Sequence, residues 1–272
     1  MLARRHALLA SGAALLLLHH TPPTALAAVV PFPKKVLVVG ATGETGRRIV
    51  AQLRAAGVAV RAGVRDVKKG QSLGLALAGA ELVKADVTDG VDALVDAIGD
   101  ADAVVCATGF TPSFNLGKDN AKAVDGLGTR ALIDAAKRAG VKRLVLVTSL
   151  LTNAPAVGQA ENPNYKVLNL FGGILDEKRG SEIYLERSGL QYTIIRPGGL
   201  SNDPPSVTGA IIAGPADPFL GLESDPGREI SRDSVALVCV EALRNDSSVG
   251  KIMEIVASPT AATSTPDAWF AV

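Results

Sequence analysis

From Lys34 onward, short apolar runs alternate with longer segments in which apolar residues recur every three or four positions. The short runs have the length of β-strands, and several are apolar at almost every position, as strands covered on both faces of a sheet are. They span residues 36–39, 58–64, 80–84, 103–107, 143–148, 192–195 and 251–256. This alternation predicts βαβ units and therefore an α/β fold, with a doubly wound parallel Rossmann sheet in a single domain.

The segments between these runs carry helix signals. Ile49 and Leu53 lie four positions apart on one helical face, and the apolar residues of segment 127–135 also suggest one apolar side. Gly57 and Gly140 follow these two segments, and glycine commonly ends a helix by adopting the left-handed conformation. We therefore expect helices to alternate with the strands.

The last third of the chain has a different pattern. Prolines and glycines interrupt residues 197–215, which predicts loops and a place for a substrate lid. A helix is predicted over residues 231–243, with Ser231 as an N-cap signal. The polar tail after Ser258 is expected to be poorly ordered.

The first thirty residues have the layout of an export signal. Arg4 and Arg5 precede an apolar stretch over residues 7–18, and small residues spaced as in a signal-peptidase site follow at 25–28. The apolar stretch is shorter than the roughly 20 residues that a membrane-spanning helix needs. We therefore predict a cleavable targeting or export signal over 1–27, a linker over 28–33, the folded domain over 34–257 and a flexible tail over 258–272.

Charge and the rare residue types exclude several functions. The net charge is +1 and no basic run is interleaved with aromatics, so nucleic acid is not expected as a partner. All three histidines lie within the first twenty residues, and Cys106 and Cys239 fit no metal-ligand or redox spacing. Without the signal, no histidine-bound metal and no histidine-dependent catalysis is expected. Acid–base chemistry is left to Lys, Tyr, Asp, Glu or a cofactor.

A glycine-rich turn follows the first strand. Gly40, Gly43 and Gly46 are spaced G-x-x-G-x-x-G, with a strand before them and a helix after them. Gly40 permits the tight turn, Gly43 lets the backbone approach a pyrophosphate, and Gly46 lets the helix pack on the strand. The phosphates then meet amides at the helix N-terminus. The turn predicts that a dinucleotide is bound by Gly40, Thr42, Gly43, Glu44, Thr45 and Gly46.

The end of the second strand selects the cofactor, because it lies beside the adenosine ribose. An acid there binds the 2′-hydroxyl of NAD(H), whereas an arginine accepts the 2′-phosphate of NADP(H). The chain offers Arg65 and then Asp66. Arg65 comes first and a guanidinium grips a phosphate bidentately, which favours NADP(H) over NAD(H). In the alternative, Arg65 faces solvent while Asp66 caps the next helix or holds NAD.

Two further strand ends are candidates for contacts with the nucleotide. Asp86 and Val87 follow the third strand, where Asp86 is placed either to meet the adenine edge or to cap a helix. Ala107, Thr108 and Gly109 follow the fourth strand. They should run beneath the ribose, because small residues allow close approach.

Seven segments together carry a resemblance to a known family. They are VLVVGATGETGRRIV, RAGVRD, KADVTDG, AVVCATGF, LVLVTSLLTN, NPNYKVLNLFGG and YTIIRPGGLSNDPP. From about Lys34 to Val256 the chain resembles the atypical short-chain dehydrogenase/reductase proteins of chloroplasts and cyanobacteria that are related to the redox-sensing subunit of the inner-envelope import translocon. The resemblance implies an NADP(H)-binding protein of plastid type.

One position departs from the wider superfamily. Typical members use Tyr-x-x-x-Lys, in which the lysine lowers the pKa of a tyrosine that passes a proton. Lys178 matches the lysine, but Ile174 stands at the tyrosine position, and Thr148 with Ser149 matches the serine region. We expect Lys178 to bind ribose hydroxyls, with a plain surface lysine as the alternative. Ser149 is expected either to orient a carbonyl or to satisfy the strand end.

Two functions are left open. The first is an NADPH-dependent reductase of a small quinoid or aromatic acceptor, because such an acceptor takes hydride without a protein acid if solvent supplies the proton. The second is a non-catalytic NADP(H) redox sensor or scaffold that reports to a protein partner. In the first, the acceptor lies between segment 204–215 and a loop that also contacts the cofactor, formed by Pro197, Gly198, Gly199 and Leu200.

The expected location combines the export signal with the plastid resemblance. Together they point to the chloroplast, in the thylakoid lumen or in association with the thylakoid membrane. A bacterial periplasm is the alternative.

Overall fold

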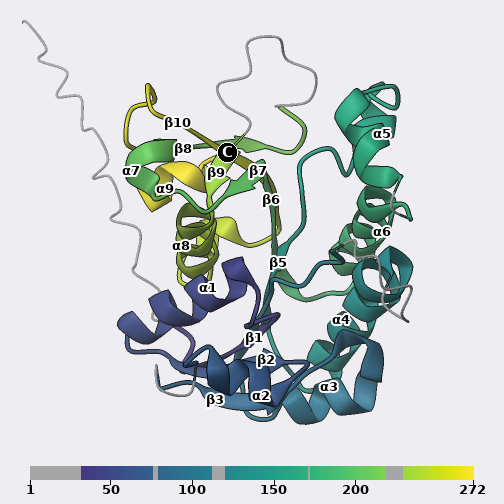
Figure 1. The fold of residues 1–272 in the computed structure, drawn as a ribbon, viewed down its shortest axis with the longest axis vertical. Helices are drawn as coiled ribbons and strands as arrows, with labels where there is room; N and C mark the ends of the chain where they lie inside the picture. The colour runs from purple at the N-terminus through teal and green to yellow at the C-terminus, as the bar shows by residue number, and fades with distance from the viewer. Residues whose placement is uncertain (1–31, 76–78, 112–119, 171, 219–228) are drawn as a thin grey trace, which may run out of the picture.

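The structure is a computed structural model that describes residues 32–75, 79–111, 120–170, 172–218 and 229–272. Its main element is an eight-stranded sheet in which seven strands are parallel and β8 runs antiparallel to β10 (Figure 1). In spatial order the strands are β3 (Glu81–Lys84), β2 (Ala59–Val64), β1 (Lys35–Val39), β4 (Ala103–Cys106), β5 (Arg143–Val147), β6 (Gln191–Pro197), β10 (Lys251–Ser258) and β8 (Ala210–Pro215). This order confirms the doubly wound Rossmann fold, with its switch point between β1 and β4.

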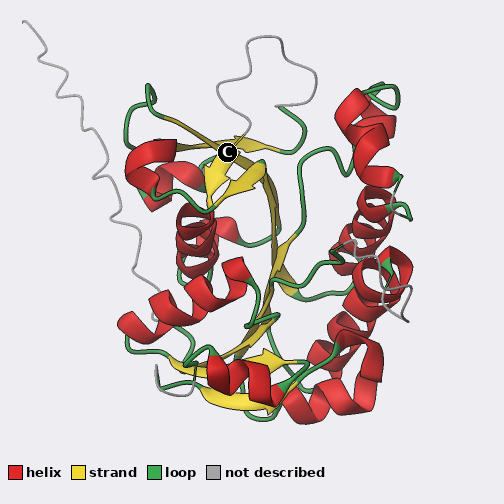
Figure 2. Ribbon diagram, viewed as in Figure 1, coloured by secondary structure: helices red, strands yellow, loops and turns green. Residues whose placement is uncertain are grey.

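Helices cover both faces of the sheet (Figure 2). The α-helices are α1 (Glu44–Ala55), α2 (Val67–Ser72), α3 (Val91–Ile98), α4 (Thr129–Arg138), α5 (Pro163–Asn169), α6 (Ile174–Glu186), α7 (Pro205–Thr208), α8 (Arg232–Ala242) and α9 (Pro266–Trp269). Shorter elements are the 3-10 turns η1 (Val87–Asp89), η3 (Ala154–Val157) and η4 (Asp246–Ser248), the π-helix η2 (Lys122–Gly128), and the parallel pair β7 (Gly199–Ser201) and β9 (Glu229–Ser231).

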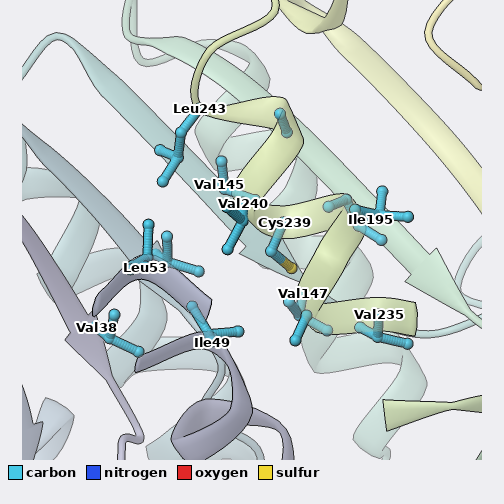
Figure 3. Packing of buried hydrophobic residues seen from close by; sticks show 14 of the residues in the cluster. Val38, Ile49, Leu53, Val145, Val147, Ile195, Val235, Cys239, Val240 and Leu243 are labelled. Carbon is cyan, nitrogen blue, oxygen red and sulfur yellow. The ribbon is translucent and has the colours of Figure 1, made fainter. Parts of the chain in front are cut away.

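Two hydrophobic clusters lie on opposite faces of the sheet. Alternate residues of β1 divide between them, since Val36 and Val38 face the α1 and α8 side whereas Leu37 and Val39 face the α3, α4 and α6 side. Figure 3 shows the first cluster, in which side chains of α1 and α8 meet those of β1, β5 and β6. Burial on both faces explains why these strands are apolar at consecutive positions.

All seven strand-like runs seen in the sequence are strands of the main sheet, to within a few residues at each end. Gly57 and Gly140 adopt φ values of 78° and 75°, as expected for glycines that end helices. The helix predicted over 231–243 is α8, and the Ser231 hydroxyl accepts a hydrogen bond from the N–H of Asp233 at 3.2 Å.

Two expectations about the carboxyl-terminal part were wrong. Segment 204–215 is not a run of loops, because it contains α7 and the edge strand β8. Strand β8 is held by backbone pairing with β10, some forty residues away, which local turn residues do not reveal. The tail after Ser258 is not free either, because Trp269 and Phe270 are buried in the first cluster. These two aromatic side chains, together with the hydrogen bond from the Asn245 side chain to Asp267 at 2.8 Å, tie the tail to the domain.

The predicted signal of residues 1–27 lies outside the described residues, as does most of the linker. Phe32, at the end of that linker, packs on the first cluster with the Arg244 guanidinium 5.0 Å from its ring centre. Across the portions of the chain that the structure describes, no helix has both the length and the apolar character needed to cross a membrane.

Candidate functional site

The glycine-rich turn between β1 and α1 has the geometry expected for two of its glycines. Gly40 has a φ of 84°, and a Cβ there would lie 2.8 Å from the carbonyl oxygen of Ala107. At Gly46 a Cβ would lie 2.1 Å from the carbonyl oxygen of Gly40, so helix α1 sits directly against the turn. Both positions therefore require glycine, one for its conformation and its neighbour, the other for close packing.

The N-terminus of α1 fits the pyrophosphate of a dinucleotide. Gly43 is the N-cap residue and brings no side chain to cap the first turn, which leaves its amides for a ligand. Thr42 is half-buried at this turn and Thr45 is buried. Glu44, also in the first turn, accepts hydrogen bonds from Arg48 at 2.9 Å and Arg47 at 2.5 Å. The hydrogen bond from Arg48 lowers the pKa of Glu44 most, and the charge of both arginines adds to it.

Arg65 and Asp66, the two residues that are candidates for selecting the cofactor, lie at the end of β2. Asp66 is the N-cap of α2 and accepts a hydrogen bond from the N–H of Lys69 at 3.2 Å, which confirms the capping interpretation of this residue. Arg65 is exposed at the carboxyl end of the strand.

The residues after β3 have mainly structural contacts. Asp86 accepts hydrogen bonds from the N–H of Thr88 at 2.9 Å and from its hydroxyl at 2.8 Å, which makes it the cap of η1. The side chain of Val87 is buried in the second hydrophobic cluster. Val87 can therefore meet a nucleotide only through its backbone.

Lys178 forms a nearly buried ion pair at the end of β4. Its Nζ lies 2.7 Å from Oδ1 of Asp125, a residue that is 2% exposed. Oδ2 of Asp125 accepts the N–H of Phe110 at 3.0 Å. A Cβ at Gly109 would lie 3.4 Å from the lysine Nζ. The pair fixes the ammonium against the Ala107, Thr108 and Gly109 segment.

Asp125 belongs to the π-helix η2, a form of helix that is rare and frequent at functional sites. The Ser181 hydroxyl donates to the carbonyl oxygen of Asp125 at 2.5 Å, which ties α6 to η2. Lys178, Asp125 and Ser181 also line one small recess with Thr108 and Thr148. The structure thus brings Lys178 and the β4 end together, as the sequence predicted, through an aspartate that the sequence analysis did not single out.

Ile174 stands in place of the superfamily's tyrosine, and the pKa of each of the three tyrosines is raised. Ile174 is buried at the superfamily's tyrosine position. Tyr165 donates its hydroxyl to Asp176, and its partial burial and this bond raise its pKa to about 12. Tyr184 donates to Asp134, and that hydrogen bond with some burial raises its pKa as well. Burial raises the pKa of Tyr192, the last of the three tyrosines.

The hydroxyls after β5 divide their roles. Thr148 is buried, and its hydroxyl donates a hydrogen bond to Oε1 of Glu182 at 2.6 Å, inside the protein. Ser149 is half-buried beside it. Of the two residues, Ser149 is the more exposed.

A group of buried charges lies beyond this point, and we call Arg196, Glu182, Asp217 and Glu254 the Arg196 cluster. Arg196 is 1% exposed and donates Nε and Nη2 to the two carboxylate oxygens of Glu182 at 3.0 and 2.7 Å. Its Nη1 lies 2.8 Å from Asp217 and 3.7 Å from Glu254. Burial alone would lower the pKa of Arg196, but the bonds to Glu182 and the three negative charges raise it overall.

The segment after β6 is fixed between two strands. Leu150 donates its N–H to the carbonyl oxygen of Pro197 at 3.0 Å, and Gly198 donates to Ile255 at 2.9 Å. Gly199 and Leu200 are exposed and begin β7. This segment therefore lies next to Ser149, but segment 204–215 does not form the facing loop that the sequence predicted.

The two cysteines lie in the interior of the domain. Cys106 and Cys239 are free and buried, and burial raises the pKa of both thiols. Those residues contain no group of three or more His, Cys, Asp or Glu side chains that could hold a metal ion.

The sequence patterns did not reveal Asp125, Glu182, Asp217 or Glu254 as site residues, and they included Arg196 only within the segment YTIIRPGGLSNDPP. One signal could have found part of the cluster. Arg196 ends the apolar run YTII, and a charge in a strand buried on both faces requires buried partners. The partners themselves lie on other elements, so no local pattern marks them.

Comparison with known proteins agrees with this geometry. The model of the NAD(P)H-binding family matches residues 40–246. An uncharacterised chloroplastic protein of Arabidopsis thaliana is 49% identical over 225 residues, or 82% of this chain and 77% of that protein. Protein TIC 62, chloroplastic, of Pisum sativum is 34% identical over 243 residues, or 83% of this chain and 43% of that protein. The chain thus spans less than half the length of TIC 62.

A named enzyme and a solved structure extend the comparison. Sanguinarine reductase of Eschscholzia californica is 37% identical over 136 residues, which cover 50% of this chain and 46% of the enzyme. A solved structure from Bacillus halodurans, named for NAD-dependent epimerases/dehydratases, is 30% identical, with a TM-score of 0.71. The match covers 88% of this chain and all of that one. The chain belongs to the NAD(P)H-binding family, as a Rossmann protein related to chloroplastic TIC 62.

Proposed function

We propose that this protein is an NADPH-dependent reductase of a small quinoid or aromatic acceptor. The observation that carries the proposal is the Lys178–Asp125 ion pair beside Gly109, combined with Ile174 where the superfamily has its tyrosine. The lysine is retained and held, whereas the proton donor is absent. Such a site suits an acceptor whose reduced form leaves as a stabilised anion and takes its proton from solvent.

The residues of the chain would divide the work as follows. The amides at the N-terminus of α1 bind the pyrophosphate, and Arg65 binds the 2′-phosphate. Lys178, with its ammonium oriented by Asp125, donates hydrogen bonds to ribose hydroxyls, and Ser149 orients the acceptor. The chemistry supplied by a bound dinucleotide is hydride transfer.

Two observations support NADP(H) over NAD(H). Arg65 is exposed at the end of β2, where the adenosine ribose is expected, and the Asp66 carboxylate caps α2. A capping carboxylate is less available to a ribose 2′-hydroxyl than a free one. The similarity to sanguinarine reductase over half of this chain supports reduction as the reaction class.

The experiment is a screen of NADPH oxidation by the purified protein against quinones, flavins and carbonyls. Turnover with a quinone or another aromatic acceptor is the expected result. Tight NADPH binding without turnover of any acceptor would remove the reductase.

The second candidate function is a redox sensor or scaffold, which binds NADP(H) and reports its redox state to a protein partner. Ile174 at the tyrosine position and the similarity to TIC 62 favour it. Since the chain covers 43% of that protein, its partners do not transfer with the similarity. A partner retained on the immobilised protein with NADPH but not with NADP⁺ would support the sensor.

We also propose a chloroplast location, because the relatives from Arabidopsis thaliana and Pisum sativum are named chloroplastic. The thylakoid lumen, an association with the thylakoid membrane and a bacterial periplasm are the finer alternatives. Mass spectrometry of the native protein would give its mature N-terminus and so test whether the predicted targeting signal is cleaved.

A further inference from the structure

The Arg196 cluster joins elements that are far apart in the sequence. Arg196 lies near the carboxyl end of β6, Glu182 lies one turn beyond Lys178 on α6, and Asp217 follows β8. Glu254 of β10 is the cross-strand neighbour of Arg196. Ligands of doubly wound sheets bind outside the carboxyl ends of the parallel strands, and that side of the sheet is its ligand edge. Although β8 is antiparallel, its last residue, Pro215, lies level with Met253 and Ile195, and so with the carboxyl end of β5, which brings the cluster to this edge.

The cluster is connected to the Lys178 recess through one hydroxyl. Thr148 lines that recess and donates its hydroxyl to Glu182, the carboxylate that Arg196 holds. Ser149 is the next residue along the chain. A shift of the cluster would therefore move the β5 end and Ser149 with it.

Backbone strain is concentrated in the two loops that meet here. Among the described residues, the non-glycine residues with positive φ are Leu151, at 70°, and Asp217, at 69°. Asn153 donates its side-chain amide to Oδ2 of Asp217 at 2.7 Å, which joins the loop after β5 to the turn after β8. A strained residue of this kind costs about 1–3 kcal/mol and persists only where the surroundings determine it, as they do at ligand sites.

Asp217 is the member of the cluster that reaches solvent. Its side chain is 17% exposed, whereas those of Glu182 and Glu254 are fully buried. Its conformation is fixed from two sides, since Oδ1 accepts from Arg196 at 2.8 Å and its N–H donates to Glu254 at 3.0 Å. The turn of residues 216–218 is therefore a rigid surface at the ligand edge.

Stability alone does not account for this arrangement. Buried ion pairs are often no better for stability than apolar side chains of the same volume, because the charges lose their hydration. Here the charges instead fix a strained turn in one position. Such precision matters for a reacting partner, since a displacement of about 1 Å can cost a hundredfold in rate.

We propose that Asp217 is a positioning residue for the acceptor: held by Arg196, Asn153 and Glu254, it fixes residues 216–218 as the wall of the acceptor site opposite Ser149. This inference rests on the proposed reductase function. It assigns to the turn after β8 the role that the sequence had given to segment 204–215.

The variants Asp217→Gly and Asp217→Asn test this assignment. Glycine adopts a positive φ without strain but removes the carboxylate, so the variant is expected to fold while its turn is released. Asparagine tolerates the same conformation and keeps one acceptor oxygen for Arg196, while its amide N–H can donate to the side-chain oxygen of Asn153 once that amide turns over, so it should rescue most of the function. Glu241→Gln is the matched control, because it weakens a different ion pair, between Glu241 of α8 and Arg244 just beyond that helix.

The first measurement is binding of menadione to the protein loaded with NADP⁺, a dead-end complex from which no hydride can leave. We expect Asp217→Gly to raise the Kd of menadione at least about tenfold. Asp217→Asn should raise it by less than threefold, and the Kd of NADP⁺ should change by less than twofold in each variant. Equal weakening of NADP⁺ and menadione would overturn the inference, as would unchanged menadione binding in Asp217→Gly.

The second measurement is the rate of NADPH oxidation by menadione, which separates this inference from the proposed function. Turnover by the wild type, together with a tenfold rise in the KM for menadione in Asp217→Gly, would support both the role of Asp217 and the reductase. If menadione binds the wild-type complex and Asp217→Gly weakens it, but no NADPH is consumed, the inference stands and the reductase falls. If the wild-type complex shows no saturable binding of menadione, the acceptor wall itself is overturned.

Discussion

The glycine-rich turn of residues 40–46 and the Arg196 cluster place their polar groups in opposite ways. The turn is built from seven consecutive residues, and the groups proposed to bind the pyrophosphate are backbone amides at the start of α1. The cluster draws one arginine and three carboxylates from β6, α6, β10 and the turn after β8. The first depends on where side chains are absent, and the second depends on side chains that meet only after the sheet has formed.

This difference gives the two regions different sensitivities. In the turn, an added methyl group is the disruptive change, since Gly46 has no space for one. In the cluster, a lost charge is the disruptive change, because the partners cannot return to water without unfolding. Four experiments sharpen or break this contrast.

The largest effect is expected for Arg196→Met, which removes the guanidinium shared by the buried Glu182 and Glu254 and leaves Glu182 with Arg179, at 3.1 Å, as its cationic partner. Removal of one partner from a buried pair costs about 3–5 kcal/mol, so the urea midpoint should fall steeply. The double variant Arg196→Met with Glu182→Gln should recover part of this loss. If the Arg196→Met variant were as stable as the wild type, the fold would not depend on the charges of the cluster.

Gly46→Ala should have the next largest effect, and it acts by crowding. Its Cβ would lie 2.1 Å from the carbonyl oxygen of Gly40, so the turn or the helix must move. Such overpacking typically costs about 1–3 kcal/mol, and binding of NADPH should fall together with stability. Gly43→Val is the matched change: its Cβ would lie 3.2 Å from the carbonyl oxygen of Gly40, a milder contact, so the fold should mostly survive while the approach of the pyrophosphate is obstructed. NADPH binding that survives in both variants would place the dinucleotide elsewhere.

The same contrast explains what the sequence could predict. Strands β1 and β4, the turn and the cap at Asp66 are encoded by contiguous residues, so their patterns could be read directly. Strand β8 and the burial of Trp269 depend on pairing and packing with distant segments. The Asp125 partner of Lys178 lies 53 positions away on a π-helix, a spacing that no local pattern encodes. The candidate residues could be named, but not the carboxylates that position them.

Cofactor choice is expected to respond to Arg65 by a smaller amount. A charge-assisted contact with the 2′-phosphate is worth about 1.5–3 kcal/mol, or roughly a ten- to hundredfold change in affinity. Arg65→Ala should weaken NADPH by that factor and leave NADH nearly unchanged, as followed by nicotinamide fluorescence. Added salt should reduce the wild-type preference, because the contact is exposed. Equal losses for both cofactors would mean that Arg65 supports the pocket in general.

The smallest effect is expected for Asp176→Asn, which tests whether Tyr165 can act as an acid. Partial burial and the bond to Asp176 hold the pKa of Tyr165 at about 12, against an ordinary value of 10.0. Because the folded-state pKa is raised, this tyrosine stabilises the fold fully below pH 10, and the contribution is lost as the pH rises from 10 toward 12. Removing the carboxylate charge should lower the pKa of Tyr165, so that one of the three tyrosines titrates at a lower pH when followed by ultraviolet absorbance.

The rate of NADPH oxidation at neutral pH should stay the same, because the proposed site beside Lys178 uses no tyrosine as its proton donor. A change in its rate that followed the Tyr165 titration would instead make this phenol the missing acid and would assign the proton to the protein.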